Sequence, residues 1–158
     1  MNKFQTAMGF IAEAEWGKRP DGGYTNLKSD LGGSTKFGIS DLRDGVKDDR
    51  SSGGTPIKDL TLEQAMEIYR RDYWDLNGLE KVQTPLCIAV FDMFVNMRRD
   101  TSQRLWKESG GDWERLIQLR KDQYGRIASK YPGQQVNLPG WMNRMNNLWK
   151  FCKIIEQS

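Results

Sequence analysis

The chain has 158 residues, enough to enclose one hydrophobic core, so we expect a single domain spanning residues 1–158. It carries 24 Lys and Arg against 21 Asp and Glu, and a formal charge of only +3 does not call for a nucleic-acid partner. The chain contains no histidine, which excludes Ser-His-Asp and Cys-His hydrolase mechanisms and the usual zinc sites of wall amidases. Carboxylate chemistry remains, and we expect neither a metal nor a cofactor.

The hydrophobic pattern of the chain predicts no membrane-spanning segment. No apolar run approaches the length of a bilayer span, and residues 1–14 lack the continuous apolar block of a signal peptide. We therefore expect a protein made in the cytoplasm, without stable membrane insertion. We also expect it to be a monomer. Cys87 and Cys152 lie in apolar helical patterns without CxxC spacing, which predicts buried free thiols.

The first predicted element is an amphipathic helix that ends near Glu15. Phe4, Met8 and Ile11 recur at helical spacing, and Glu15 follows Ile11 by four residues on the same stripe. We expect its carboxyl group where a buried face meets a cleft, whereas Glu13 points to water. The negative end of the helix dipole and partial burial both favour a protonated carboxyl group. A general acid that works near neutral pH needs this bias.

The next segment predicts a small β-hairpin. Residues 22–40 are rich in Gly, Thr and Tyr and carry turn residues at Asn26 and Asp30. Residues 41–57 predict a short helical turn followed by a loop. We expect this N-terminal part, residues 1–57, to form the side of the molecule that holds the cleft.

Helices account for the rest of the chain, residues 58–158. Thr61 and Gln64 have the spacing of a capping box, which predicts a helix start. Thr84 is expected to cap a central buried helix over residues 86–97, with Pro85 at its first position. The predicted fold class is α+β, mostly α: a single domain with a small hairpin lobe beside a helical bundle.

Asp92 and Asn96 interrupt the apolar surface of that central helix. They are four residues apart, so they share one stripe, which either lines a groove or is a satisfied buried pair. Further along, Asp112 is expected to cap a long helix, and a last helix runs from Trp141. Arg144 flanks the apolar stripe of that last helix and is expected either to approach Glu15 or to be solvated.

Several segments resemble glycoside hydrolase family 108, a family of N-acetylmuramidases common in phages. Residues 4–15 resemble its Phe-led helix, and residues 30–39 resemble its Asp-x-Gly-Gly-x-Thr-x-x-Gly-Ile pattern without a gap. Residues 69–74 and 91–96 resemble its Tyr-Arg-x-x-Tyr-Trp and Phe-Asp-x-x-Val-Asn segments, and residues 139–144 its Gly-Trp-x-Asn-Arg segment. The resemblance therefore spans most of the chain.

This resemblance implies a single lysozyme-like domain and a lysozyme that cleaves the β-1,4 bond between N-acetylmuramic acid and N-acetylglucosamine in bacterial peptidoglycan. Glu15 would be the general acid, Asp30 the second carboxylate and Thr35 the residue that positions water. A water held by Thr35 and Asp30 suggests inversion, but the separation of the carboxyl groups decides between inversion and retention. Substrate contacts are expected from six further residues: Tyr24, Lys36, Gly38, Asp92, Asn96 and Arg144.

The chain departs from the family pattern at residues 16–21, a segment that we call the insertion. It separates Glu15 from the Gly-Gly pair that usually follows the acid directly. Asp21 is therefore a rival for the acid role, because it precedes Gly22 and keeps the family's spacing to Asp30. A side chain on a Pro-led loop, however, lacks the environment of a helix end.

Two other functions stay open at this point. A lytic transglycosylase would use the same general acid, and a noncatalytic peptidoglycan-binding or secretion-assisting protein would need no acid at all. The resemblance also implies a phage endolysin that reaches the wall in the periplasm with the help of a holin, and a bacterial muramidase is the alternative source.

Overall fold

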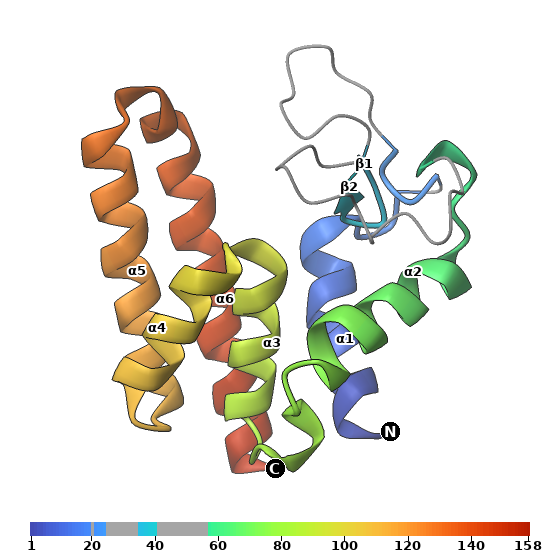
Figure 1. Ribbon diagram of the computed structural model, residues 1–158, viewed down its shortest axis with the longest axis horizontal. Helices are drawn as coiled ribbons and strands as arrows, with labels where there is room; N and C mark the ends of the chain where they lie inside the picture. Colours follow the sequence, from blue (N-terminus) through green and yellow to red (C-terminus); the bar gives the residue numbers. More distant parts are fainter. Residues whose placement is uncertain (20, 25–34, 41–56) are drawn as a thin grey trace. The chain divides into compact units, whose positions relative to one another are not determined.

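The structure is a computed structural model that describes residues 1–19, 21–24, 35–40 and 57–158 (Figure 1). Its described part is mostly helical, as the sequence predicted. The elements follow in the order α1 (Lys3–Glu15), β1 (Thr35–Lys36), β2 (Ile39–Ser40), η2 (Ile57–Asp59), α2 (Leu62–Tyr69), η3 (Arg70–Asp75), η4 (Leu79–Lys81), α3 (Leu86–Asn96), α4 (Arg99–Ser109), α5 (Trp113–Lys130), η5 (Pro132–Asn137) and α6 (Leu138–Gln157).

The chain divides into two compact units, which we describe separately. Residues 1–7 and 79–158 form the first unit, and residues 8–78 form the second. The single domain that we expected from chain length stays a prediction. In the described part of the chain, no helix combines the length and apolar character needed to cross a membrane.

Helix α3 is the buried centre of the first unit. Every residue from Cys87 to Phe94 is buried, in keeping with the apolar run that predicted this helix. Helices α4, α5 and α6 all contact α3, and α5 and α6 lie side by side in antiparallel directions (Figure 1). Phe4 adds an edge-to-face contact with Phe91, with ring centroids 5.9 Å apart.

Two predicted helix caps are confirmed. The Thr61 hydroxyl accepts a hydrogen bond from the Gln64 amide at 3.1 Å, and the Gln64 side chain accepts one from the Thr61 amide at 2.9 Å. At the start of α5, an Asp112 carboxylate oxygen accepts the amides of Glu114 and Arg115. Both caps satisfy amides that the first turn of a helix leaves without partners.

The predicted cap of α3 was wrong. Helix α3 begins at Leu86 with Pro85 at the N-cap, and no side chain caps it. Backbone carbonyls take the early amides instead: Cys87 donates to Gln83 at 3.0 Å, and Ile88 donates to Pro85 at 3.0 Å. The backbone therefore satisfies these amides in place of the Thr84 hydroxyl.

The second unit contains a short hairpin and the helix α2. Strands β1 and β2 pair in antiparallel fashion, with Lys36 opposite Ile39. The wider hairpin lobe over residues 22–40 stays a prediction, because residues 25–34 lie outside the described part. The same holds for the predicted turn and loop over residues 41–57, of which only Ile57 is described.

Helix α2 continues directly into the π-helix η3. The unit's fully buried side chains include Ile11 of α1, Ile39 of β2, Ile68 of α2 and Trp74 of η3. One core therefore joins the end of α1, the hairpin and the α2–η3 segment. Glu15, at the end of α1, belongs to this unit.

Candidate active site

Glu15 is the last residue of α1, as the sequence predicted. The stripe that carries it is buried at Met8 and Ile11, and Glu15 itself is half-buried. Glu13 is exposed. The phase of the helix therefore places the Glu15 carboxyl group at the border between the core and the surface.

The turn between β1 and β2 packs against the stem of Glu15. Gly38 has a φ of +71°, and a Cβ added there would lie 2.9 Å from Glu15 Cγ and 2.5 Å from Tyr69 Oη. Tyr69 is fully buried, and its hydroxyl donates a hydrogen bond of 2.7 Å to the carbonyl of Phe37. Residues from α1, the hairpin and α2 therefore meet at Gly38, where only a glycine leaves enough room.

Residues 16–19 of the insertion form a cap on the C-terminal end of α1. Gly17 has a φ of +54°, and its amide donates to the carbonyl of Ala12 at 2.8 Å, as in a left-handed helix cap. Arg19 donates through Nε to the carbonyl of Trp16 at 3.0 Å and through Nη2 to the carbonyl of Glu15. The insertion therefore satisfies carbonyls at the helix end where Glu15 lies.

Asp21, the rival of Glu15, occupies a turn. Its side chain is exposed, and its Oδ1 accepts the Gly23 amide at 3.1 Å. Its backbone carbonyl accepts the amide of the half-buried Tyr24 at 3.3 Å. The two candidate acids therefore differ in exposure, since Glu15 is half-buried and Asp21 is not.

Two of the other predicted site residues lie on β1. Thr35 and Lys36 are half-buried, and Lys36 Nζ donates to the carbonyl of Lys58 at 2.9 Å. The same ammonium group lies 5.5 Å from the ring centroid of Phe37. Lys36 is thus held over the hairpin turn. Asp30 lies outside the described residues, so its role as second carboxylate stays a prediction.

In the first unit, Asp92 forms a buried ion cluster. Its Oδ2 accepts Arg120 Nη1 at 2.7 Å, and its Oδ1 accepts Arg144 Nη2 at 2.7 Å. Burial acts to raise the pKa of Asp92, but the guanidinium groups of Arg144 and Arg120 outweigh it and hold that pKa below its ordinary value. Asp92 is fully buried. This arrangement matches the alternative of a satisfied buried group rather than a groove residue.

Sequence reasoning missed Arg120. It lies on the buried stripe of α5, three residues after Ile117 and four before Tyr124, and it is fully buried. Its Nε has no hydrogen-bond partner within the described part of the chain. The signal in the sequence was a charged residue at an apolar position of a helix. A buried arginine needs an anionic partner, so this position predicts a buried ion pair.

Asn96 joins the same cluster through Tyr124. The Asn96 side-chain amide donates to Tyr124 Oη at 2.6 Å, and Arg120 donates to the same oxygen at 3.0 Å. Trp141 of α6 stacks on the Tyr124 ring, with centroids 4.9 Å apart. Asn96, Trp141 and Arg144 are half-buried, so they form the accessible border of the cluster.

Comparison with known proteins identifies the family. Residues 16–97 match the family model described as glycosyl hydrolase 108, which is more than half of the chain. The chain belongs to the glycosyl hydrolase 108 family. This membership places it among the glycoside hydrolases. No curated protein and no solved structure shows a significant match.

The segment that matches glycosyl hydrolase 108 begins one residue after Glu15. It includes Asp21 as well as Asp30 and Thr35, and it extends to the residue after Asn96. The choice between the two candidate acids therefore stays open: the matched range covers Asp21, and Glu15 is the half-buried one of the two.

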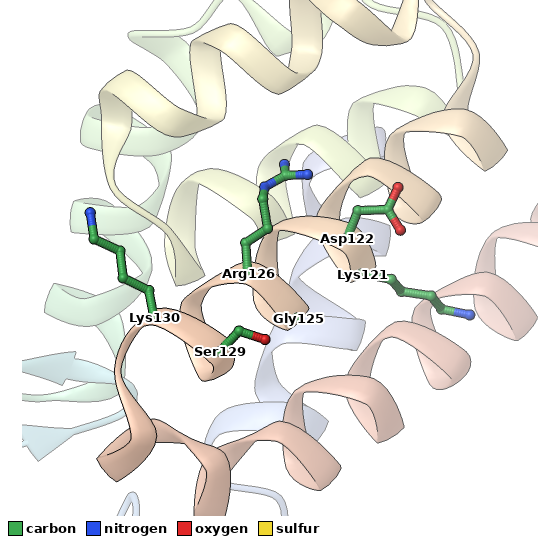
Figure 2. Close-up of a pocket in the computed structure, with 6 residues that line it drawn as sticks. All are labelled: Lys121, Asp122, Gly125, Arg126, Ser129 and Lys130. Atoms are coloured by element: carbon green, nitrogen blue, oxygen red, sulfur yellow. The ribbon is translucent and has the colours of Figure 1, made fainter.

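A shallow open pocket lies elsewhere on this glycosyl hydrolase. Figure 2 shows it on α5, where it is lined by Lys121, Asp122, Gly125, Arg126, Ser129 and Lys130. These residues occupy the face of α5 opposite the buried positions Arg120 and Tyr124. The pocket contains none of the predicted site residues.

The described residues also show how the ionisable groups are distributed. Within them, no group of three or more Asp, Glu and Cys side chains gathers in a way that could hold a metal ion. Glu15 and Asp92 belong to different units, so the predicted approach of Arg144 to Glu15 stays a prediction.

Proposed function

We propose that this member of the glycosyl hydrolase 108 family is an N-acetylmuramidase. It would hydrolyse the β-1,4 bond between N-acetylmuramic acid and N-acetylglucosamine in bacterial peptidoglycan. The observation that carries the proposal is the position of Glu15, half-buried at the end of α1 with its stem against Gly38 of the hairpin turn. A general acid needs such a border position, partly shielded from water and within reach of a bound glycan.

The proposed reaction needs only side chains of this chain and one water. Glu15 gives its proton to the glycosidic oxygen as the bond to the sugar carbon breaks. A water oriented by Thr35 bonds to that carbon and loses a proton to Asp30. Proton NMR of the first anomer released distinguishes this single displacement from a double displacement with retention.

Substrate contacts are proposed for Tyr24, Lys36, Gly38, Asn96 and Arg144. Tyr24 and Lys36 are half-buried, and Asn96 and Arg144 lie at the half-buried border of the ion cluster. Asp92 is left out, because it is fully buried and both of its carboxylate oxygens accept arginine donors.

The decisive experiment compares two matched acid-to-amide variants. Purified peptidoglycan is digested with the wild type, with Glu15→Gln and with Asp21→Asn, and soluble fragments are analysed by mass spectrometry. We expect reducing muramic acid ends from the wild type and from Asp21→Asn, and none from a folded Glu15→Gln. The opposite pattern would transfer the acid role to Asp21.

The same fragments separate the other candidate functions. Anhydromuramic ends would identify a lytic transglycosylase, because the sugar's own hydroxyl then replaces water. Sedimentation with insoluble peptidoglycan without any released fragment would identify a noncatalytic wall-binding protein. A folded but nearly inactive Asp30→Ala variant would support the second carboxylate, whereas a variant that only loses stability would assign Asp30 to a turn.

The proposed biological setting is host-cell lysis by a phage. It rests on the family resemblance of the N-terminal segments and on the chemistry of the proposed substrate. Expression of the wild type together with a holin should lyse a Gram-negative cell, and Glu15→Gln should not.

A further inference from the structure

The hairpin turn beside Glu15 has an unusual backbone conformation. Phe37 and Gly38 are its two central residues, and their φ angles are +52° and +71°. Positive φ at both positions is the pattern of a type I′ turn, in which Asn-Gly is the usual pair. Phe37 is the one residue other than glycine with positive φ among the described residues. A bulky side chain adopts this conformation only where its surroundings hold it there.

Three neighbours hold Phe37. Its amide donates to the carbonyl of Gly22 at 2.8 Å, and its carbonyl accepts the Tyr69 hydroxyl at 2.7 Å. Its ring meets the ring of Trp16 edge-to-face, with centroids 5.3 Å apart. Both backbone polar groups and the ring of Phe37 are therefore engaged, two of them by residues in or directly after the insertion.

The direction of the turn determines what touches Glu15. Because Phe37 has positive φ, the chain reverses at Gly38 and brings that residue against Glu15 Cβ and Cγ. The Tyr69 hydroxyl lies on the same side, 2.5 Å from the position that a Gly38 Cβ would take. Small movements of the turn would therefore reach the stem of Glu15 directly.

Resting on the proposed function, we propose that Phe37 and Tyr69 are positioning residues for the general acid. The strained turn is held by its contacts with Trp16 and Tyr69, and it restricts the rotamers of the Glu15 side chain. Neither residue needs to touch the substrate. On this view the insertion supports the site, because it supplies Trp16 and leads into Gly22, which has no Cβ to displace the Phe37 ring.

The test removes one hydroxyl group. In Tyr69→Phe the ring stays in the core but the bond to Phe37 is lost; Tyr131→Phe, at an exposed tyrosine, is the matched control. We expect Tyr69→Phe to lower kcat for peptidoglycan about tenfold with KM nearly unchanged, because a misplaced catalytic group reduces rate more than binding. Tyr131→Phe should leave both constants unchanged.

Two variants at Phe37 complete the series. Phe37→Asn suits positive φ but removes the ring, and we expect it to fold while losing kcat as Tyr69→Phe does. Phe37→Tyr keeps the ring and should retain wild-type kcat. If Phe37→Asn keeps wild-type kcat, the contact between the Phe37 and Trp16 rings has no positioning role, and the proposal is overturned.

A second readout does not depend on catalysis. Three-bond NMR couplings report the χ1 rotamer of Glu15, and NOEs between its methylene protons and the Gly38 Cα protons report the contact. We expect one rotamer and strong NOEs in the wild type, and averaged couplings with weaker NOEs in Tyr69→Phe. Unchanged couplings in Tyr69→Phe would overturn the positioning role. If the wild type releases no reducing muramic acid ends, the proposed function is refuted. The NMR couplings would still test whether Tyr69 positions the Glu15 side chain.

Discussion

Asp92 of α3 and Arg120 of α5 form an ion pair that is closed to solvent, with Oδ2 and Nη1 2.7 Å apart and neither side chain exposed. Arg144 of α6 reaches the other oxygen of the same carboxylate. Three helices of the first unit are therefore joined at one carboxyl group. Removing one arginine from such a cluster leaves a buried carboxylate with only part of its compensating charge.

The first prediction concerns the stability of this cluster. Arg120→Met should lower the free energy of unfolding by about 3 kcal/mol or more, as expected when one member of a buried pair is removed. Arg104→Met is the matched control, because the pair of Arg104 with Glu108 is exposed and should be worth less than about 1 kcal/mol. Urea denaturation of both variants measures the difference. Equal losses would mean that the buried pair contributes no more than a surface pair.

The second prediction is a pH dependence of stability. The folded-state pKa of Asp92 lies below its ordinary value of 3.8, so the unfolded chain takes up this proton more readily. The stabilisation that ionised Asp92 contributes is fully present above the pKa of Asp92 in the unfolded chain. It is lost as the pH falls through the pKa of Asp92 in the folded protein. Urea midpoints measured from neutral pH down into this acid range should fall more steeply for the wild type than for Asp92→Asn. Parallel curves would contradict the prediction.

The third prediction compares two glycines with positive φ. Gly78→Ala should cost about 1–2 kcal/mol, because its φ is +64° and nothing lies within 4 Å of the added Cβ. Gly38→Ala carries the same backbone cost and adds a clash with Tyr69 Oη at 2.5 Å. It should therefore destabilise the protein clearly more than Gly78→Ala in thermal unfolding. A smaller effect at Gly38 would show that the turn can shift away from Tyr69.

The fourth prediction concerns the two thiols, which the structure confirms as buried and free. Burial raises the pKa of Cys87 to about 11 and that of Cys152 to about 12, so neither thiol ionises near neutral pH. Because the thiolate is the reactive form, a disulfide reagent should label neither residue in the folded protein and both in denaturant. Rapid labelling of the native protein would indicate that one of these sites opens to solvent.

Much of the local structure was predictable from residues close together in sequence. The phase that brings Glu15 to the edge of the core depends on its spacing from Met8 and Ile11 in one helix. The caps at Thr61 and Asp112 depend on amides within three residues. Thr84 shows the limit of such reasoning, because backbone carbonyls competed for the amides that its hydroxyl was expected to accept.

The sequence by itself determined the helix phases and the family resemblance, since each depends on residue type and short spacing, and it predicted carboxylate chemistry. Only the tertiary structure decided the partners of Asp92 and of Phe37, because Arg120 lies 28 residues from Asp92 and Tyr69 lies 32 residues from Phe37. A buried arginine or tyrosine requires a hydrogen-bond or ion-pair partner. Which group it meets depends on how the faces of separate helices and turns pack, and spacing along the chain does not encode that directly.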